Sequence, residues 1–481
     1  MTSILLFFGE KTVDSNPYLD AKYTLRPEAF GAVLFFYGTD GDYLSYLSHT
    51  EALIVACSDG SNSIENICSI ISHIFACDTV DAKKKIEDVF HRLNSGNHEI
   101  IKTCLPRNTH GKDKLLHSML DAWNKEQISS KISQKPRSPI SVTIAPSTKC
   151  TTDCIYCYAD RDAFLNSSII PTETWNKAIS ELANSGTKYL ILSGSDPLLY
   201  LGIHKLIETA IAGGMSVSLS TKTPISEARA VQLANAGMNI NTSDQIHEIQ
   251  ISLDSVTSRL SQIVGNGMNI DAIRKTIHLL VDNKITVNIQ TVLTNLNSSQ
   301  DELDKLYRFL RPLGISSWKI RTAFKSNNNL KTTELVPPDE SILSCESFLS
   351  SLNSQGDFKI DLSGIHKKGG SAINRREFCP GGISSIFIRP DGFVSLCETC
   401  QFQIGTASLS IRDTSILDIW HSKELEELRH PDPTALGRQC KDCTRASVCI
   451  DEGFCIAENI HIFNGTFVPD NHCTDSAVWR K

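Results

Sequence analysis

The sequence lacks a long apolar run, a strongly basic character and the pattern of an N-terminal signal. Lys and Arg number 47 against 54 Asp and Glu, which gives a net charge of −7 and no basic stretch to attract nucleic acid. No run reaches the 18 apolar residues of a membrane span, and the apolar residues 4–8 are too short for a signal peptide. We therefore expect a cytoplasmic protein that binds neither nucleic acid nor membrane.

Cysteine, by contrast, is abundant, with 16 residues in a chain of 481. In a chain without a signal, this number points to metal or redox chemistry in a reducing compartment. Four of the cysteines occupy apolar positions in the first quarter of the chain, where we expect plain core packing. They are Cys57, Cys68, Cys77 and Cys104. The length predicts about three domains.

Three other cysteines form the most informative motif. Cys150, Cys154 and Cys157 are spaced C-x3-C-x2-C, with Tyr156 directly before the third. Three thiolates can hold three irons of a four-iron, four-sulfur (4Fe-4S) cluster, whereas ordinary clusters have four cysteine ligands, so one iron stays open to a small molecule. Zinc is the alternative, but zinc motifs pair C-x2-C units and none lies nearby. The motif resembles that of the radical S-adenosylmethionine (SAM) superfamily, in which the open iron binds SAM.

The middle block, residues 140–325, alternates short β-branched runs with helical patterns, which predicts parallel βαβ units. Six strands are too few for an eight-stranded barrel. We therefore expect an α/β fold with an open, partial (β/α)6 barrel, which is also the core fold of radical SAM enzymes. Two expected helices cover residues 172–185, with Thr172 as N-cap and Gly186 after the end, and residues 298–313, before Gly314. The expected strands are residues 141–145, 188–193, 215–220, 248–253, 285–292 and 316–321.

The same resemblance implies a SAM site at the carboxyl ends of these strands. Residues 192–197, Leu-Ser-Gly-Ser-Asp-Pro, resemble a variant of the family's Gly-Gly-Glu motif, which holds the SAM ammonium group. In this variant Gly194 and Ser195 precede Asp196, which replaces the Glu; by composition the segment is also a good turn. Tyr156 resembles the family's aromatic residue near the adenine. Polar residues that end the third and fourth strands are expected to contact the ribose and carboxylate of SAM. They are Ser218, Ser220, Lys222, Ser252 and Asp254.

The C-terminal block, residues 340–481, holds nine of the sixteen cysteines. Their spacing resembles the SPASM extension of peptide-modifying radical SAM enzymes, although five residues stand between Cys449 and Cys455 where the family usually has three. The resemblance implies two auxiliary 4Fe-4S clusters. One would be held by Cys440, Cys443, Cys449 and Cys473, and the other by Cys379, Cys397 and Cys455. The fourth ligand of the latter stays open among Cys345, His366, Cys400 and a substrate on the bare iron. A zinc knuckle at Cys440 and Cys443 is the alternative.

The first block, residues 1–130, predicts three strands followed by three helices, a winged-helix-like arrangement. Together with residues 26–34 it resembles the recognition element of enzymes that mature ribosomally made peptides (RiPPs), which binds a leader peptide as an added strand. We expect this addition at residues 43–47, weakened by proline at Ser45 if the N–H of Ser45 faces the edge. DNA binding needs a basic helix, whereas residues 63–75 contain no Lys or Arg. A purely structural cap is the other alternative.

Taken together, the three resemblances imply a radical SAM peptide maturase, an oxidoreductase. Such an enzyme uses a 5′-deoxyadenosyl radical to install a carbon–carbon or thioether cross-link in a precursor peptide that is bound through its leader. Its cofactors would be three 4Fe-4S clusters and SAM, with a flavodoxin or ferredoxin as reductant. Two alternatives stay open. One is a SPASM dehydrogenase that activates another protein, as in sulfatase maturation, and the other is a non-enzymatic iron–sulfur electron carrier.

Overall fold

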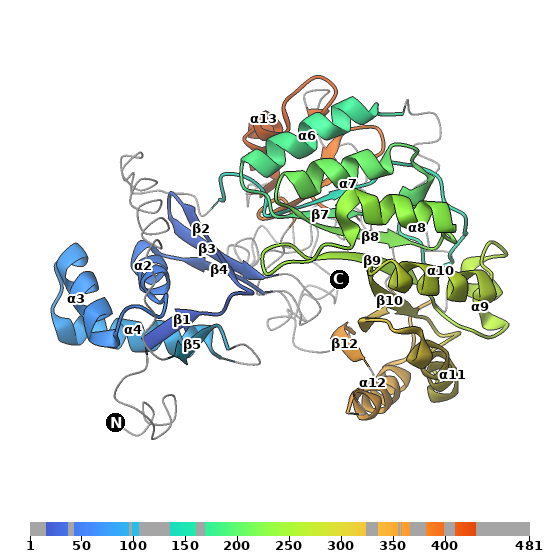
Figure 1. Cartoon of the computed structure of the whole chain (residues 1–481), viewed down its shortest axis with the longest axis horizontal. Helices are drawn as coiled ribbons and strands as arrows, with labels where there is room; N and C mark the ends of the chain where they lie inside the picture. The colour runs from blue at the N-terminus through green and yellow to red at the C-terminus, as the bar shows by residue number, and fades with distance from the viewer. Residues whose placement is uncertain are drawn as a thin grey trace, which may run out of the picture. The chain divides into compact units, whose positions relative to one another are not determined.

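A computed structural model of the chain divides it into two compact units, Met1–Arg137 and Ser138–Lys481. Figure 1 shows the elements of each unit. The structure describes residues 16–36, 43–95, 99–104, 135–159, 169–323, 335–354, 356, 358–365, 381–398 and 409–429. Within these residues, no helix has both the length and the apolar character that a membrane crossing requires.

The N-terminal unit contains a three-stranded antiparallel sheet followed by three helices, as expected. The strands, in sheet order, are β2 (Thr24–Glu28), β3 (Gly31–Phe36) and β4 (Tyr43–Leu47). The helices are α2 (His49–Cys57), α3 (Ile64–Phe75) and α4 (Thr79–Leu93). The first strand of the sheet includes Pro27, which an edge strand tolerates. A further pair, β1 (Asn16–Leu19) and β5 (Ile101–Cys104), was not predicted.

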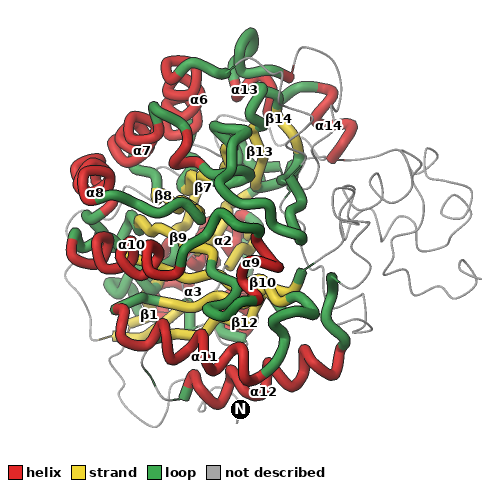
Figure 2. Tube along the Cα trace, turned by 90° about the vertical axis from the view of Figure 1, so that its right-hand side faces the viewer, coloured by secondary structure: helices red, strands yellow, loops and turns green. Residues whose placement is uncertain are grey.

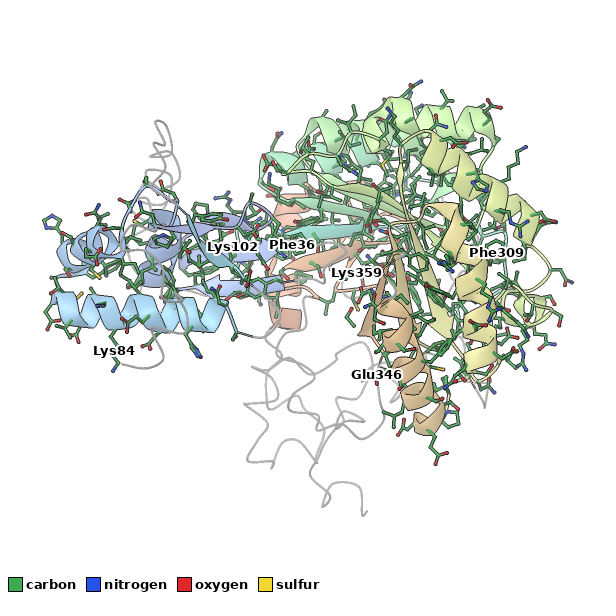
Figure 3. The ribbon with its side chains drawn as sticks, turned by 60° about the horizontal axis from the view of Figure 1, so that its bottom comes forward. Phe36, Lys84, Lys102, Phe309, Glu346 and Lys359 are labelled. Atoms are coloured by element: carbon green, nitrogen blue, oxygen red, sulfur yellow. The ribbon has the colours of Figure 1, made fainter. Side chains whose placement is uncertain are left out.

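Local sequence explains where these helices begin. Ser48 and Glu51 form a reciprocal capping box at α2, and Ser63 and Asp78 accept hydrogen bonds at the starts of α3 and α4. Helices α3 and α4 bury one face each, whereas α2 is buried on all sides, at residues 52–55 and at Cys57. Lys84 on α4 points to solvent (Figure 3). Cys57 and Cys68 are buried in this core and Cys77 packs against it, as predicted. The side chain of Cys104 is not described.

The hairpin between β2 and β3 determines which backbone groups of the sheet face its edges. Glu28 pairs with Gly31 across a two-residue turn, and such a pair exchanges both of its hydrogen bonds. Because the pattern alternates along each strand, the backbone of Leu34 faces β4 and bonds its partner Ser45. The N–H groups of Leu44 and Tyr46 therefore face the outer edge of β4, which pairs with no further strand among the described residues, and that of Ser45 does not. A proline at Ser45 was expected to weaken leader binding only if the Ser45 N–H faced the outer edge. This N–H faces β3, so that expectation does not apply.

The second unit is built on a nine-stranded sheet of order β12-β11-β10-β9-β8-β7-β6-β13-β14, parallel except for β14. All six predicted strands are present. They are β6 (Ser141–Ile144), β7 (Tyr189–Leu192), β8 (Ser216–Thr221), β9 (His247–Ser252), β10 (Thr286–Leu293) and β11 (Ser317–Thr322). Three strands that were not predicted extend the sheet at its two ends. They are β12 (Lys359–Gly364), β13 (Ser385–Ile388) and β14 (Val394–Ser395).

The helices of this unit lie on one side of the curved sheet, in an arc outside the strands (Figure 2). The arc consists of α6 (Thr172–Asn184), α7 (Ile203–Ala212), α8 (Glu227–Leu233), α10 (Ile270–Asp282), α11 (Gln300–Leu310) and α12 (Asp339–Asn353). Shorter elements are η2 (Pro197–Leu199), η3 (Ala234–Met238), α9 (Arg259–Val264), η4 (Arg311–Leu313), α13 (Ile416–Trp420) and α14 (Lys423–Arg429). The predicted N-cap Thr172 is wrong by one residue. Pro171 holds that position, and the Thr172 hydroxyl lies 3.0 Å from the hydroxyl of Tyr200.

The two faces of the sheet differ in polarity. On β8, Val217 and Leu219 are buried on the helix side, whereas Ser218 and Ser220 are half-buried on the inner, concave face. The same alternation on β9 places Glu248 and Gln250 on the inner face. The structure is therefore an open barrel with an apolar outer layer and a polar interior, and the interior leads to the predicted site.

Candidate functional site

The loop after β6 carries the three predicted cluster ligands. The Thr152 hydroxyl lies between the first two sulfurs, 3.6 Å from Cys150 Sγ and 3.5 Å from Cys154 Sγ. The Cys157 N–H donates to the Cys154 carbonyl over 3.0 Å, which closes a tight turn between the second and third cysteines. All three are half-buried. The structure thus brings the predicted ligands together in one loop at the carboxyl end of a barrel strand.

A second segment, at the end of α9, supports this loop from outside. The N–H groups of Asp153 and Ile155 donate to the carbonyls of Val264 and Ile263, over 3.0 and 2.9 Å. A Cβ atom on Gly267 would stand 1.9 Å from the Thr151 carbonyl oxygen, far inside van der Waals contact. Only glycine fits this approach. Gly267 was not predicted, because the residues around it in the sequence do not indicate its close approach to the distant Thr151 carbonyl.

The turn after β7 holds the loop from the other side. The Ser195 hydroxyl donates to the Ser147 carbonyl, and the Asp196 N–H donates to the Lys149 carbonyl over 3.0 Å. Gly194 has φ +86°, and a Cβ there would stand 2.8 Å from that of Ala145. The turn and the cluster loop are therefore closely packed.

The Asp196 carboxylate is buried and already has several donors. It accepts hydrogen bonds from the hydroxyls of Thr221 (2.9 Å) and Thr223 (2.7 Å) and from the backbone N–H groups of Lys222 (3.1 Å) and Thr223 (3.0 Å). These bonds tie the β7 turn to the end of β8. The contact of Asp196 with the SAM ammonium group stays a prediction, and any such contact would add to these bonds.

Hydrogen bonds at the Asp254 carboxylate join three residues that are predicted to contact SAM: Asp254 itself, Tyr156 and Lys222. Its Oδ2 accepts hydrogen bonds from the Tyr156 hydroxyl (2.6 Å) and from Lys222 Nζ (3.0 Å), and its Oδ1 accepts one from the Val292 N–H (2.9 Å). Lys222 Nζ also lies 5.6 Å from the centre of the Tyr156 ring. Tyr156 from the cluster loop, Lys222 from β8 and Asp254 from β9 thus form one connected polar group.

The electrostatics of this group follow from burial and from the charge of Asp254. Burial disfavours the Lys222 ammonium, but Asp254 and the neighbouring thiols outweigh it and raise the pKa of Lys222. Burial, and then the negative charge of Asp254, raise the pKa of Tyr156 well above its ordinary value. Burial also raises the pKa of Cys154, against the opposing charge of Lys222. Tyr156 is therefore a neutral donor, and Lys222 is a buried cation beside the thiols.

The predicted serines lie on the inner face. The Ser218 hydroxyl donates to Glu248 over 3.1 Å, and the Ser220 hydroxyl accepts from Gln250 over 3.0 Å. The Ser252 carbonyl lies 3.5 Å from Lys222 Nζ. Glu248 also pairs with Lys319 on β11 at 3.6 Å. The sequence signal for this polar layer was the polar residue at every second position of the strands.

Glu398, which was not predicted, reaches the site from the segment after β14. The Tyr158 hydroxyl donates to its carboxylate, and Thr143 on β6 forms a further hydrogen bond with it. Burial raises the pKa of Glu398, against the hydrogen bond from Tyr158 and the positive charge of Arg321. Neither Glu398 nor Tyr158 belongs to a recognisable motif beyond following a predicted cysteine ligand.

The auxiliary ligands are described in part. Cys397 is half-buried directly after β14 and packs against the barrel core. Most of the other expected positions lie outside the described residues. They are Cys379, Cys440, Cys443, Cys449, Cys455 and Cys473, together with His366 and Cys400. Cys345 is fully buried in α12, where burial raises its thiol pKa to about 11. The place of Cys345 among the candidates for the fourth ligand stays a prediction.

Comparisons with known proteins agree with this geometry. The family described as the radical SAM superfamily matches residues 144–310, and the SPASM family, described as an iron-sulfur cluster-binding domain, matches residues 379–444. The chain contains a radical SAM domain and a SPASM domain. Both families bind 4Fe-4S clusters.

Relatives of this chain include an enzyme named for a peptide and one named a maturase. A PqqA peptide cyclase of Rhodopseudomonas palustris is 23% identical over 350 residues, which cover 71% of this chain and 88% of the relative. The mycofactocin maturase MftC of Mycolicibacterium smegmatis is 24% identical over 344 residues, covering 70% and 83%. The crystal structure of Streptococcus suis SuiB bound to its precursor peptide SuiA has a TM-score of 0.62 and 16% identity, covering 95% of this chain and all of SuiB. This last likeness shows a shared fold.

The residues of the radical SAM domain fit the cluster that the family binds. Within the described ranges, no three His, Cys, Asp or Glu side chains converge as ligands of a single metal ion would. Three thiols in one loop, with one hydroxyl between two of the sulfurs, instead suit a larger group that takes one thiolate per iron. The buried Lys222 ammonium offsets the negative charge that such a group would bring.

Proposed function

We propose that this chain is a radical SAM oxidoreductase that installs a carbon–carbon or thioether cross-link in a ribosomally made precursor peptide. The observation that carries the proposal is the loop of Cys150, Cys154 and Cys157 at the mouth of a polar barrel interior. A relative named a PqqA peptide cyclase, another named a mycofactocin maturase, and the likeness to SuiB, solved with a precursor peptide, support a peptide as the substrate.

The cluster and SAM, when bound, supply a 5′-deoxyadenosyl radical that can take a hydrogen atom from an unactivated carbon. The chain's own residues bind and orient. Cys150, Cys154 and Cys157 hold the cluster, while Asp254 fixes Tyr156 and Lys222 for contact with SAM. Gly194, Ser195 and Asp196 shape the turn proposed to hold the SAM ammonium group. The polar inner face offers hydrogen-bonding side chains to a peptide backbone.

The N-terminal unit is proposed to be a winged-helix-like recognition element for the leader of the precursor. Its support is the outer edge of β4, which pairs with no further strand among the described residues and which the N–H of Leu44 faces. Arg92 of α4 lies beside this edge, where it donates to Ser45 over 3.1 Å and pairs with Glu51 at 2.5 Å. A leader bound here would pass between β4 and the end of α4.

The remaining parts of the proposal concern the auxiliary clusters, the electron donor and nucleic acid as a partner. Two auxiliary clusters would be held by the seven SPASM cysteines, which include Cys397. A flavodoxin or ferredoxin in the reducing cytoplasm would supply the electron. The net charge of −7 offers no support for nucleic acid as a partner.

The proposal is tested by anaerobic reconstitution followed by assay with dithionite and SAM. Replacing Cys150, Cys154 and Cys157 together with Ala should abolish 5′-deoxyadenosine formation. Total iron should fall from about twelve to about eight per chain, from the cysteine arithmetic of three clusters. Cys77→Ala, at a half-buried position of the other unit, is the matched control. It should retain both 5′-deoxyadenosine formation and full iron. Undiminished 5′-deoxyadenosine from the triple variant would overturn the assignment.

The peptide substrate requires a second assay. The wild-type chain is co-expressed with short open reading frames encoded beside its gene, and the peptides are analysed by mass spectrometry. A cross-link appears as the loss of two hydrogens from one peptide, and the triple variant should leave that peptide unmodified. If SAM is cleaved but no neighbouring peptide changes mass, the substrate class is wrong while the radical SAM assignment stands.

A further inference from the structure

Two residues far apart in the sequence join the two loops that carry expected cluster ligands. Tyr158 follows Cys157, a ligand of the SAM cluster, and Glu398 follows Cys397, an expected ligand of an auxiliary cluster. The Tyr158 hydroxyl donates a hydrogen bond to the Glu398 carboxylate, although 240 positions separate them. This bond connects the two ligand loops directly, from side chain to side chain.

The sheet alone does not bring the two ligand loops together. Strand β13 lies parallel to β6, with Ile388 opposite Ile144, so the carboxyl ends of both strands reach the same edge. The Ala145 N–H donates to the Ile388 carbonyl over 3.0 Å and continues this pairing into the cluster loop. β14 then returns antiparallel to β13, with Ser395 opposite Phe387, and so leads the chain back toward the amino ends of these strands before Cys397. The link between the two ligand loops is therefore made by side chains rather than by strand pairing.

Further contacts hold both ends of the bond in place. Thr143, on the inner face of β6, forms a hydrogen bond with Glu398, and Ser193 at the end of β7 forms one with Tyr158. Arg321 of β11 adds a positive charge near the carboxylate. Thr143 and Arg321, from two barrel strands, therefore act on a carboxylate that belongs to the SPASM side of the chain, and Ser193, after β7, acts on its tyrosine partner.

We propose that the Tyr158–Glu398 bond positions the auxiliary-cluster loop against the SAM-cluster loop and so couples the redox properties of the two clusters. The inference rests on the proposed function, because it takes Cys397 as an auxiliary ligand. Hydrogen bonds and charges around ligand sulfurs set cluster potentials, and outer contacts orient the ligands. Tyr158 and Glu398 act here as positioning residues that work through their neighbouring cysteines.

The test measures potentials and spin coupling rather than turnover. Tyr158→Phe removes the donor with almost no change in volume, and should leave total iron at about twelve per chain. We expect a shift in the midpoint potential of the Cys397 cluster, and a loss of magnetic interaction between the reduced clusters in electron paramagnetic resonance spectra. Tyr200→Phe is the matched control, since it removes another tyrosine hydroxyl of the same domain, one that donates to the Ile170 carbonyl (3.0 Å) just before α6.

Further variants separate the outcomes. Glu398→Leu should also shift the potential, since it removes both the bond and a negative charge. Adding Tyr158→Phe to it should shift the potential little further, because the bond is already broken. Fully additive shifts, or a Tyr158→Phe protein that matches Tyr200→Phe in both readouts, would overturn the coupling. Cys397→Ala checks the underlying assignment. If it keeps full iron, Cys397 is no ligand and the inference falls with it; if it loses a cluster while Tyr158→Phe changes nothing, only the coupling is wrong.

Discussion

Asp254 illustrates how much of the site depends on a single carboxylate. It is 2% exposed and binds Tyr156, Lys222 and the Val292 N–H. Asp254→Ala would leave the Lys222 ammonium buried without its counter-charge, which costs about 3 kcal/mol or more. We expect a decrease of that size in the free energy of unfolding, measured by denaturant titration before reconstitution.

The control for this variant is an ion pair on the surface. Asp271 pairs with Arg274 at 3.2 Å, and its side chain is 87% exposed. Exposed pairs contribute about 0–1 kcal/mol, so Asp271→Ala should change stability little. Equal losses in the two variants would show that the Lys222–Asp254 pair does not depend on burial for its effect.

Gly267 makes a prediction of a different kind, because it concerns space rather than charge. In Gly267→Ala the new Cβ meets the Thr151 carbonyl, so the cluster loop must move. We expect the loss of about four irons per chain together with 5′-deoxyadenosine formation. Gly214→Ala is the control. Its φ of +81° makes alanine strained, yet its Cβ would meet nothing within 4 Å, so it should lower the melting temperature and retain full iron. Full iron in Gly267→Ala would contradict the steric argument.

At the scale of elements, the sequence predicted what local pattern and spacing encode. The six barrel strands and the helices of the N-terminal unit each carry a continuous periodicity, and all were found with ends displaced by a few residues. Strands β1, β5 and β13 were missed because each has only four residues and exists through a distant partner. The same limit hid Gly267 and Glu398, whose roles depend on segments far along the chain.

Strand β4 allows a prediction that separates two neighbouring backbone groups. Leu44→Pro removes an N–H at the outer edge, whereas Ser45→Pro removes one that bonds β3. We expect Leu44→Pro to weaken leader binding with a small change in melting temperature, since Pro27 shows that this sheet tolerates proline at an edge. Ser45→Pro should lower the melting temperature itself. Binding is measured by fluorescence anisotropy with a labelled leader peptide, and undiminished binding by Leu44→Pro would exclude strand addition at this edge.

At the scale of the whole molecule, the division into two units predicts separable activities. Removal of residues 1–137 leaves the unit with the SAM-cluster loop, so SAM cleavage should continue. Modification of a full-length precursor should fall strongly, because tethering through the leader raises the effective concentration of the core peptide. Both are measured in one reaction, by chromatography of 5′-deoxyadenosine and by mass spectrometry of the peptide. Full peptide turnover by the truncated chain would reduce the N-terminal unit to a structural cap.

The pairing of β6 with β13 also affects how the protein is made. Ser141 lies opposite Ser385, 244 residues later in the chain. At ribosomal rates of about 5–20 residues per second, roughly 12 to 50 s pass between the synthesis of β6 and that of β13. During that time the outer edge of β6 is an unpaired strand, a template for wrong pairing with other chains. Completion of the barrel edge is thus delayed until most of the SPASM domain's first half has been synthesised, and slow translation or a shortened C-terminus should favour aggregation over folding.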